Sequence, residues 1–171
     1  QNGPNNALRI NGLGAPRNRE VQIEMEQAAT KHLDKIGATV DTSKYMKPDY
    51  SEQDFTYEAS VIIPVFNRAK TIADAVGSAL AQKTTFKYNV IVVDNHSTDG
   101  TSDILEAAAA EDKRLIHIIP ERTDLGIGGC WNVAVDDARC GRFAVQLDSD
   151  DLYSSPQTLQ RIVDEFHKQG A

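Results

Sequence analysis

An acidic cluster directly follows the last short apolar run of the sequence. Asp148, Asp150 and Asp151 come after the run 143–147. If this run is a buried strand, residues two positions apart at its exit point to the same side, so Asp148 and Asp150 should converge. Mg²⁺ and Mn²⁺ characteristically bind through one or two carboxylates and complete their shell with water and substrate phosphate. The cluster therefore predicts a metal site that would hold a diphosphate.

Two other roles are open to these carboxylates. They could be solvated side chains of an ordinary turn, or they could cap the following helix. Capping is the weaker alternative, because Ser155 and Pro156 already provide a suitable N-cap and first-turn residue for that helix. Carboxylates buried together without a cation would repel one another, so a metal is their natural counter-charge. We favour the metal site.

The elements that would position this cluster begin at residue 60, where short apolar runs alternate with helical stripes. Runs rich in Val and Ile are typical of strands in a parallel sheet that is buried on both faces. The sequence therefore predicts a Rossmann-like α/β fold, a doubly wound, mostly parallel sheet with helices on both faces. The expected strands are 61–66, 90–93, 115–119 and 143–147, and the expected helices are 69–82, 101–111, 128–138 and 156–170.

Residues 1–58 predict an extension that precedes the domain 59–171. The segment 1–17 is rich in Asn, Gly and Pro, as loops and disordered segments are. One amphipathic helix is expected over 18–36, ended by Gly37, and a polar linker follows from Asp41. Because the sequence begins at Gln1 and not at Met, we expect an excised piece of a longer protein, truncated at the C-terminus of its domain.

The composition excludes several classes of function. A formal net charge of −7 without any basic run argues against binding nucleic-acid phosphates or anionic lipid. There is no signal peptide, and no apolar stretch approaches the roughly 20 residues of a membrane span. We therefore expect a cytoplasmic protein that meets a membrane only through parts outside this chain. Cys130 and Cys140 lack metal-ligand spacing and are expected to be packed, reduced thiols.

Polar side chains gather at the carboxyl ends of the predicted strands, where ligands bind in doubly wound sheets. Turn and cap chemistry explains each of these segments equally well when it is taken alone. A dinucleotide-binding fold would place G-x-G-x-x-G after the first strand, and the segment 64–70 lacks it, so that interpretation largely fails. The turn Gly126-Ile127-Gly128-Gly129 could direct backbone N–H groups toward an anion, with tight helix–strand packing as an equal alternative.

Four segments in this order resemble the motifs of family 2 glycosyltransferases, a large group with the GT-A fold. The segment 60–67 resembles the opening strand V-I-I-P-x-[YF]-N, and 93–101 is similar to V-D-[DN]-x-S-x-D-x-T. The segment 124–132 looks like N-x-G-x-x-x-A-x-N, although Asp124 stands where the family has Asn and Cys130-Trp131 replaces Ala-Arg. Asp148-Ser149-Asp150 matches the D-x-D motif. The resemblance covers about 59–171.

This resemblance implies a metal-dependent, inverting transfer of a sugar from a nucleoside diphosphate to an acceptor hydroxyl, as in glycan assembly. In the family, the residue matched by Asp94 binds the base, and the D-x-D carboxylates bind ribose and the metal-diphosphate. The implied metal ligands are Asp148 and Asp150, and the implied cofactor is Mn²⁺ or Mg²⁺. The residues implied to contact the nucleotide sugar are Pro64, Phe66, Asn67, Arg68, Asp94, Asn95, Ser97, Arg122, Gly126, Asn132, Asp148 and Ser149.

The donor is expected to be a UDP-sugar ahead of a GDP-sugar, and the acceptor a glycan, lipid or protein. The family's acceptor site and its general base, an acidic residue, lie beyond the fourth β–α unit, so the base is expected after Ala171 and this piece alone is expected to be inactive. One alternative is a nucleotide-binding module without transferase activity. Another is a sugar nucleotidyltransferase, but its glycine-rich loop after the first strand is missing here.

Overall fold

The computed structural model describes residues 16–39 and 54–169, which belong to two separate units, 1–51 and 52–171. The first unit contains the helix α1 (Pro16–Ile36), close to the helix expected at 18–36. Gly37 ends it with a left-handed φ of 69°, and the N–H of Ala38 donates to the carbonyl of Leu33 at 2.9 Å. The loop expected over 1–17 lies outside the described residues except at Pro16 and Arg17, where the expectation is wrong because both belong to α1. Most of the polar linker also lies outside the described residues.

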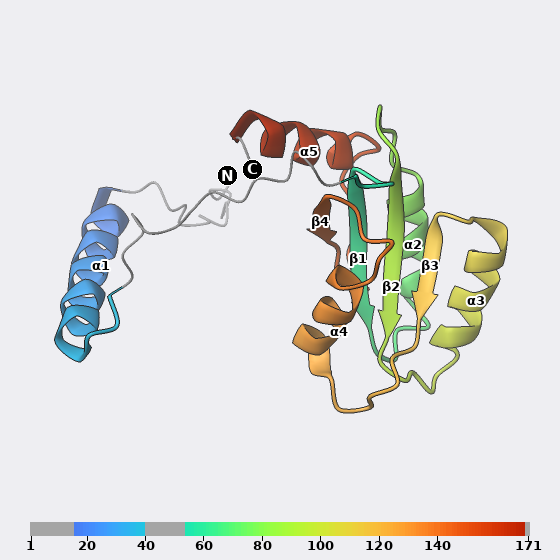
Figure 1. The fold of residues 1–171 in the computed structure, drawn as a ribbon, viewed down its shortest axis with the longest axis horizontal. Coiled ribbons are helices and arrows are strands. Elements are labelled where there is room, and N and C mark those ends of the chain that lie inside the picture. The colour runs from blue at the N-terminus through green and yellow to red at the C-terminus, as the bar shows by residue number, and fades with distance from the viewer. Residues whose placement is uncertain (1–15, 40–53, 170–171) are drawn as a thin grey trace, which may run out of the picture. The chain divides into compact units, whose positions relative to one another are not determined.

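The second unit is built on a sheet of four parallel strands. They are β1 (Ala59–Val65), β2 (Tyr88–Asp94), β3 (Leu115–Ile118) and β4 (Phe143–Gln146). Their order is β3-β2-β1-β4, and Val61 is level with Val90 on one side and with Val145 on the other (Figure 1). Every residue of β1 and β2 is buried, which explains their continuous apolar sequence. The prediction of an α/β parallel sheet is confirmed.

Helices cover both faces of this sheet. They are α2 (Ile72–Leu80), α3 (Thr101–Glu111), α4 (Gly126–Val135) and α5 (Thr158–Gln169). Alternate strand residues point to opposite faces, so Val61 and Ile63 pack with the buried side chains of α2, α3 and α5, whereas Ile62 packs with α4. The chain passes from β3 through α4 to β4 on the other side of β1. The topological switch point, where such sheets bind ligands, therefore lies between β1 and β4.

The element boundaries differ from the expected ones mainly at helix ends. α2 begins at Ile72, after a turn over 68–71, and α4 begins at Gly126, earlier than expected. α5 begins at Thr158, so Ser155 lies in a preceding turn, where its Oγ accepts the N–H of Gln157 at 3.3 Å. None of the described helices is long and apolar enough to cross a membrane.

Candidate functional site

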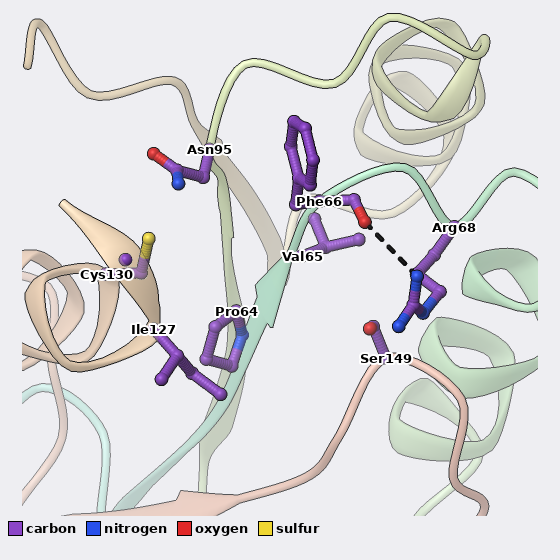
Figure 2. A pocket seen from close by; sticks show the side chains of 9 residues that line it. Pro64, Val65, Phe66, Arg68, Asn95, Ile127, Cys130 and Ser149 are labelled. Atoms are coloured by element: carbon purple, nitrogen blue, oxygen red, sulfur yellow. Dashed lines mark hydrogen bonds between the residues drawn. The ribbon is translucent and has the colours of Figure 1, made fainter. Parts of the chain in front are cut away.

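A pocket of about 240 Å³ opens at the carboxyl end of β1, against the first turns of α4 (Figure 2). It lies at the switch point of the sheet. Six of the residues expected at the site line it: Pro64, Phe66, Arg68, Asn95, Gly126 and Ser149. Three further lining residues were not predicted, namely Val65, Ile127 and Cys130. Their side chains are apolar or of a type common in protein cores, so no polar residue in the sequence indicated that these positions belong to the site.

The loop that leaves β1 is tied to the loop that leaves β2. Asn67 adopts a left-handed φ of 52°, which asparagine tolerates better than most residues. Its N–H donates to Ser97 Oγ at 2.9 Å, and its Oδ1 accepts the N–H of Thr98 at 2.8 Å. Asp99 accepts the N–H of Ala69 at 3.0 Å. Asn67 and Ser97 therefore hold the two loops together and do not line the pocket.

Asp94 is fully buried at the end of β2. Its Oδ1 accepts the N–H of Ser97 at 2.9 Å, and its Oδ2 accepts the hydroxyl of Ser102 at 2.5 Å. Burial raises the pKa of Asp94, but the hydrogen bonds from Ser102 and Ser97 outweigh this effect and hold the pKa below its usual value. The carboxylate of Asp94, which is expected to contact the nucleobase, is thus ionised, enclosed and hydrogen-bonded to its own chain.

Asn95, the next residue, lines the pocket. Its N–H donates to the carbonyl of Val65 at 2.9 Å, which fixes its backbone beside β1. Its side-chain Oδ1 is buried and has no hydrogen-bond partner within 16–39 and 54–169. A buried acceptor without a partner costs about 1–3 kcal/mol. Asn95 therefore lines the pocket while its Oδ1 is enclosed by the protein.

The acidic cluster follows β4 as an alternation of buried and exposed residues. Leu147 and Ser149 are buried, whereas Asp148 and Asp150 are exposed. Asp148 Oδ1 accepts Gln146 Nε2 at 2.8 Å, and the carbonyl of Ser149 accepts the hydroxyl of Thr71 at 3.0 Å. Among the residues that the structure describes, no hydrogen bond joins the Asp150 or Asp151 side chain to α5, so these carboxylates do not cap it.

Arg68 brings a positive charge to this edge of the pocket. Its Nε lies 3.7 Å from Asp150 Oδ2. Its Nη1 donates to the carbonyl of Asn67 at 3.2 Å and to that of Phe66 at 3.5 Å, the bond drawn in Figure 2. Both side chains of the Arg68–Asp150 pair are about half exposed, at 48% and 55%, so the pair itself adds little stability. A guanidinium in this position is free to bind a phosphate through two parallel hydrogen bonds.

The carboxylates fit a hard divalent cation. The described residues contain no group of three or more His, Cys, Asp or Glu that could hold a metal. Two carboxylates without a complete protein cage suit Mg²⁺ or Mn²⁺, because these ions keep positions for water and substrate phosphate. Asp148 and Asp150 are the residues that would hold the ion.

The remaining expected contacts lie outside the pocket lining. Arg122 forms a bidentate pair with Asp124, at 2.9 Å for each bond, and both side chains are 70% exposed. Asn132 is exposed on α4.

Gly126 does line the pocket, and its φ of 53° explains why glycine stands at the start of α4. Cys130 is a buried free thiol, and burial raises its pKa.

The sequence model of glycosyl transferase family 2 matches residues 60–171. The chain belongs to this family. A putative teichuronic acid biosynthesis glycosyltransferase, TuaG of Bacillus subtilis, is 40% identical over 103 residues, which cover 60% of this chain and 40% of TuaG. The chondroitin synthase of Escherichia coli is 38% identical over 109 residues, which cover 64% of this chain and 15% of the synthase. The chain thus spans well under half the length of these relatives.

Solved structures agree with this assignment. S. aureus TarS 1–349, in complex with UDP, is 31% identical with a TM-score of 0.57 and covers 66% of this chain and 33% of TarS 1–349. The complex of the same protein with UDP-GlcNAc is 30% identical with a TM-score of 0.57, over 66% of this chain and 32% of that one. A mannosyltransferase from Pyrobaculum calidifontis, in complex with GDP-Man and Mn²⁺, is 24% identical with a TM-score of 0.57, over 68% of this chain and 36% of the transferase. This last likeness shows the fold, which is GT-A.

Proposed function

We propose that this chain is the donor-binding part of an enzyme that transfers a sugar from a nucleoside diphosphate to an acceptor hydroxyl. One observation carries the proposal: the pocket at the switch point is lined by Phe66, Arg68 and Asn95, and Arg68 Nε lies 3.7 Å from Asp150 Oδ2. Membership of glycosyl transferase family 2 supports the same reaction class.

The base would lie beside Asn95. The family resemblance places the contact to the base at Asp94, and Asn95 lines the pocket beside it. The Phe66 ring, which is 54% exposed at the same pocket, offers a stacking surface for a base. A UDP-sugar is favoured over a GDP-sugar because TarS binds UDP and UDP-GlcNAc.

The diphosphate would lie at the other edge of the pocket. Asp148 and Asp150 would hold Mn²⁺ or Mg²⁺, and Arg68 would donate to phosphate oxygens. When bound, the cation supplies Lewis-acid stabilisation of the charge that develops on the leaving diphosphate. Arg68 contributes a second positive charge to the same oxygens. Inversion at the anomeric carbon and an acidic general base after Ala171 stay predictions.

Titration with nucleotides tests this function. UDP should bind in the presence of Mn²⁺. Arg68→Ala should weaken this binding about tenfold, which is the loss expected from about 1.4 kcal/mol of hydrogen-bond energy. Arg161→Ala is the matched control, because it removes an exposed arginine of α5 outside the pocket lining. The absence of UDP binding with either metal would overturn the proposal.

A further inference from the structure

Thr71 connects the two sides of the pocket. It is the residue before α2, and its hydroxyl donates to the carbonyl of Ser149 at 3.0 Å. Ser149 lines the pocket, and so does Arg68, which begins the turn that Thr71 ends (Figure 2). Thr71 and Ser149 are 78 positions apart in the sequence, so their hydrogen bond is a tertiary contact between the two loops.

The hydroxyl of Thr71 does not cap the helix that it precedes. A threonine at this position ordinarily accepts an N–H of the first helical turn through its side chain. Among the described residues no such side-chain bond forms, and the N–H groups of Asp74 and Ala75 donate to the backbone carbonyl of Thr71 instead, each at 3.1 Å. The contact with Ser149 is therefore the one that the hydroxyl serves.

The carbonyl of Ser149 belongs to the turn that carries the proposed metal ligands. The N–H of Asp151 donates to the carbonyl of Asp148 at 3.1 Å, which closes a four-residue turn with Ser149 and Asp150 at its centre. This local bond sets the positions of Asp148 and Asp150 relative to each other. It does not set the position of the turn relative to the rest of the domain.

Thr71 supplies that second constraint. On one side of the turn, the N–H of Leu147 donates to the carbonyl of Ile62 at 3.1 Å, and on the other the N–H of Tyr153 donates to a hydroxyl of α2. Between these two points, the bond from Thr71 is the one hydrogen bond within 54–169 that joins the turn to another element. Without it, the turn would be held at its two ends alone.

The turn that contains Arg68 is held independently. The N–H of Arg68 donates to Thr101 Oγ1 at 2.9 Å, and the N–H of Ala69 donates to Asp99 at 3.0 Å. Loss of the Thr71 hydroxyl would therefore release the turn 148–151 and leave Arg68 in place. The Arg68 guanidinium lies 3.7 Å from the Asp150 carboxylate, so a diphosphate that contacts both Arg68 and a cation on the turn requires this separation to be fixed.

We propose that Thr71 is a positioning residue, whose hydroxyl couples cation binding to diphosphate binding by holding the turn 148–151 at a fixed distance from Arg68. The inference rests on the proposed function, because it assigns the diphosphate to Arg68 and to a cation on this turn. Its consequence is selective: loss of the hydroxyl lowers the factor by which the cation strengthens nucleotide binding and leaves binding without the cation intact. A threonine that served stability alone would affect both conditions alike.

The test measures UDP binding by calorimetric titration of the whole 171-residue chain, with saturating Mn²⁺ and in EDTA. The ratio of the two affinities is the coupling factor between cation and nucleotide. Thr71→Val should lower this factor about fivefold, which corresponds to about 1 kcal/mol, the net contribution of one hydrogen bond. The affinity in EDTA should change less than twofold. Thr71→Ser retains the hydroxyl and should keep the factor within twofold of the wild type.

Ser78→Ala is the matched control. Ser78 also lies on α2, and its Oγ accepts the N–H of Tyr153 at 3.3 Å. The substitution therefore removes a hydrogen bond between α2 and the same loop, but outside the turn 148–151. It should leave the coupling factor within twofold of the wild type, and an equal fall in Ser78→Ala and Thr71→Val would contradict the inference.

The remaining outcomes separate the inference from the proposed function. An unchanged coupling factor in Thr71→Val overturns the inference, and so does an equal loss of affinity with and without Mn²⁺. If Thr71→Val does not fold, a Thr71→Ser variant with a wild-type melting temperature and a lowered coupling factor overturns it. A wild type that binds UDP without any gain from Mn²⁺ also overturns the inference, whereas a wild type that binds no UDP in either condition overturns the proposed function itself.

Discussion

Replacing Asp94 by alanine should destabilise the domain by about 3 kcal/mol. The substitution removes both acceptors of a fully buried carboxylate and leaves the N–H of Ser97 and the hydroxyl of Ser102 without partners. A hydrogen bond to a charged group contributes about 1.5–3 kcal/mol, so the two bonds together are worth about 3–6 kcal/mol. The substitution also removes the cost of burying a charge, and this gain offsets part of the sum. Asp94→Asn keeps one acceptor and should cost about 1 kcal/mol.

The pH dependence of this difference has a definite sign. Hydrogen bonding holds the pKa of Asp94 below its usual value despite the opposing effect of burial. A carboxyl whose pKa is lower in the folded state contributes its full stability above the unfolded pKa, about 3.9, and loses it as the pH falls through the folded pKa. The stability difference between wild type and Asp94→Asn should therefore be constant from pH 7 to about pH 5 and shrink below pH 4.

Urea unfolding followed by far-ultraviolet circular dichroism measures both quantities. Other aspartates with lowered pKa, such as Asp99 and Asp112, weaken the fold in acid in the wild type and the variant alike, so the difference isolates Asp94. A cost below about 1 kcal/mol for Asp94→Ala would refute the reasoning. So would a wild-type-to-Asn difference that grows as the pH falls from 5 to 3.

Two further predictions concern the metal and the backbone. UDP with Mn²⁺ at about 100 times its dissociation constant should stabilise the domain by about 2.7 kcal/mol and raise its melting temperature. EDTA or Asp150→Ala should abolish this shift, whereas Asp151→Ala should retain it. An equal loss in both variants would contradict the assignment of Asp150. Gly77→Ala should stabilise α2 by about 0.5–1 kcal/mol, since none of the described atoms lies within 4 Å of the added Cβ. Gly141→Ala should instead destabilise the domain by about 1–3 kcal/mol, because its Cβ would lie 2.8 Å from a backbone carbon. Urea unfolding midpoints that move in the same direction for the two variants would contradict this contrast.

The parallel sheet was predictable because its strands are buried on both faces. β1 and β2 lie entirely within the core, so their residues form the continuous Val and Ile runs that the sequence shows. Helix starts were harder, since backbone geometry decides them. α5 begins after the turn at Ser155, where a serine hydroxyl bonds the N–H of Gln157, and the sequence around Ser155 and Pro156 is equally compatible with a helix that begins there.

The exposure of Asp148 and Asp150 was also predictable, because the alternation of β4 continues through its exit, whereas their convergence on one metal stays a prediction. The apolar lining was not. Ile127 and Cys130 reach the pocket only because α4 begins at Gly126 and packs beside Ile62 and Val93, and this packing depends on contacts between segments far apart in the sequence. A glycine-rich turn indicates that some backbone approaches closely there, but not which side chains do.

The different positions of Asp94 and Asn95 follow from strand parity. Ile91 and Val93 pack on the α4 face of the sheet, whereas Val90 and Val92 pack on the face that carries α3. Asp94 continues the second set and meets Ser102 of α3, and Asn95 continues the first set and enters the pocket beside α4. The pairing of Pro64 with Val93 carries the same parity across to β1, so that Phe66 follows on the pocket side.

Residue type alone favours the carboxylate as the ligand-binding group, because it is the stronger acceptor. Position adds a second condition: the charged residue is buried and holds its own loop, and the neutral amide lines the pocket. In a parallel strand that ends at a pocket, the face covered by the next crossover helix therefore decides which of two adjacent polar residues lines that pocket.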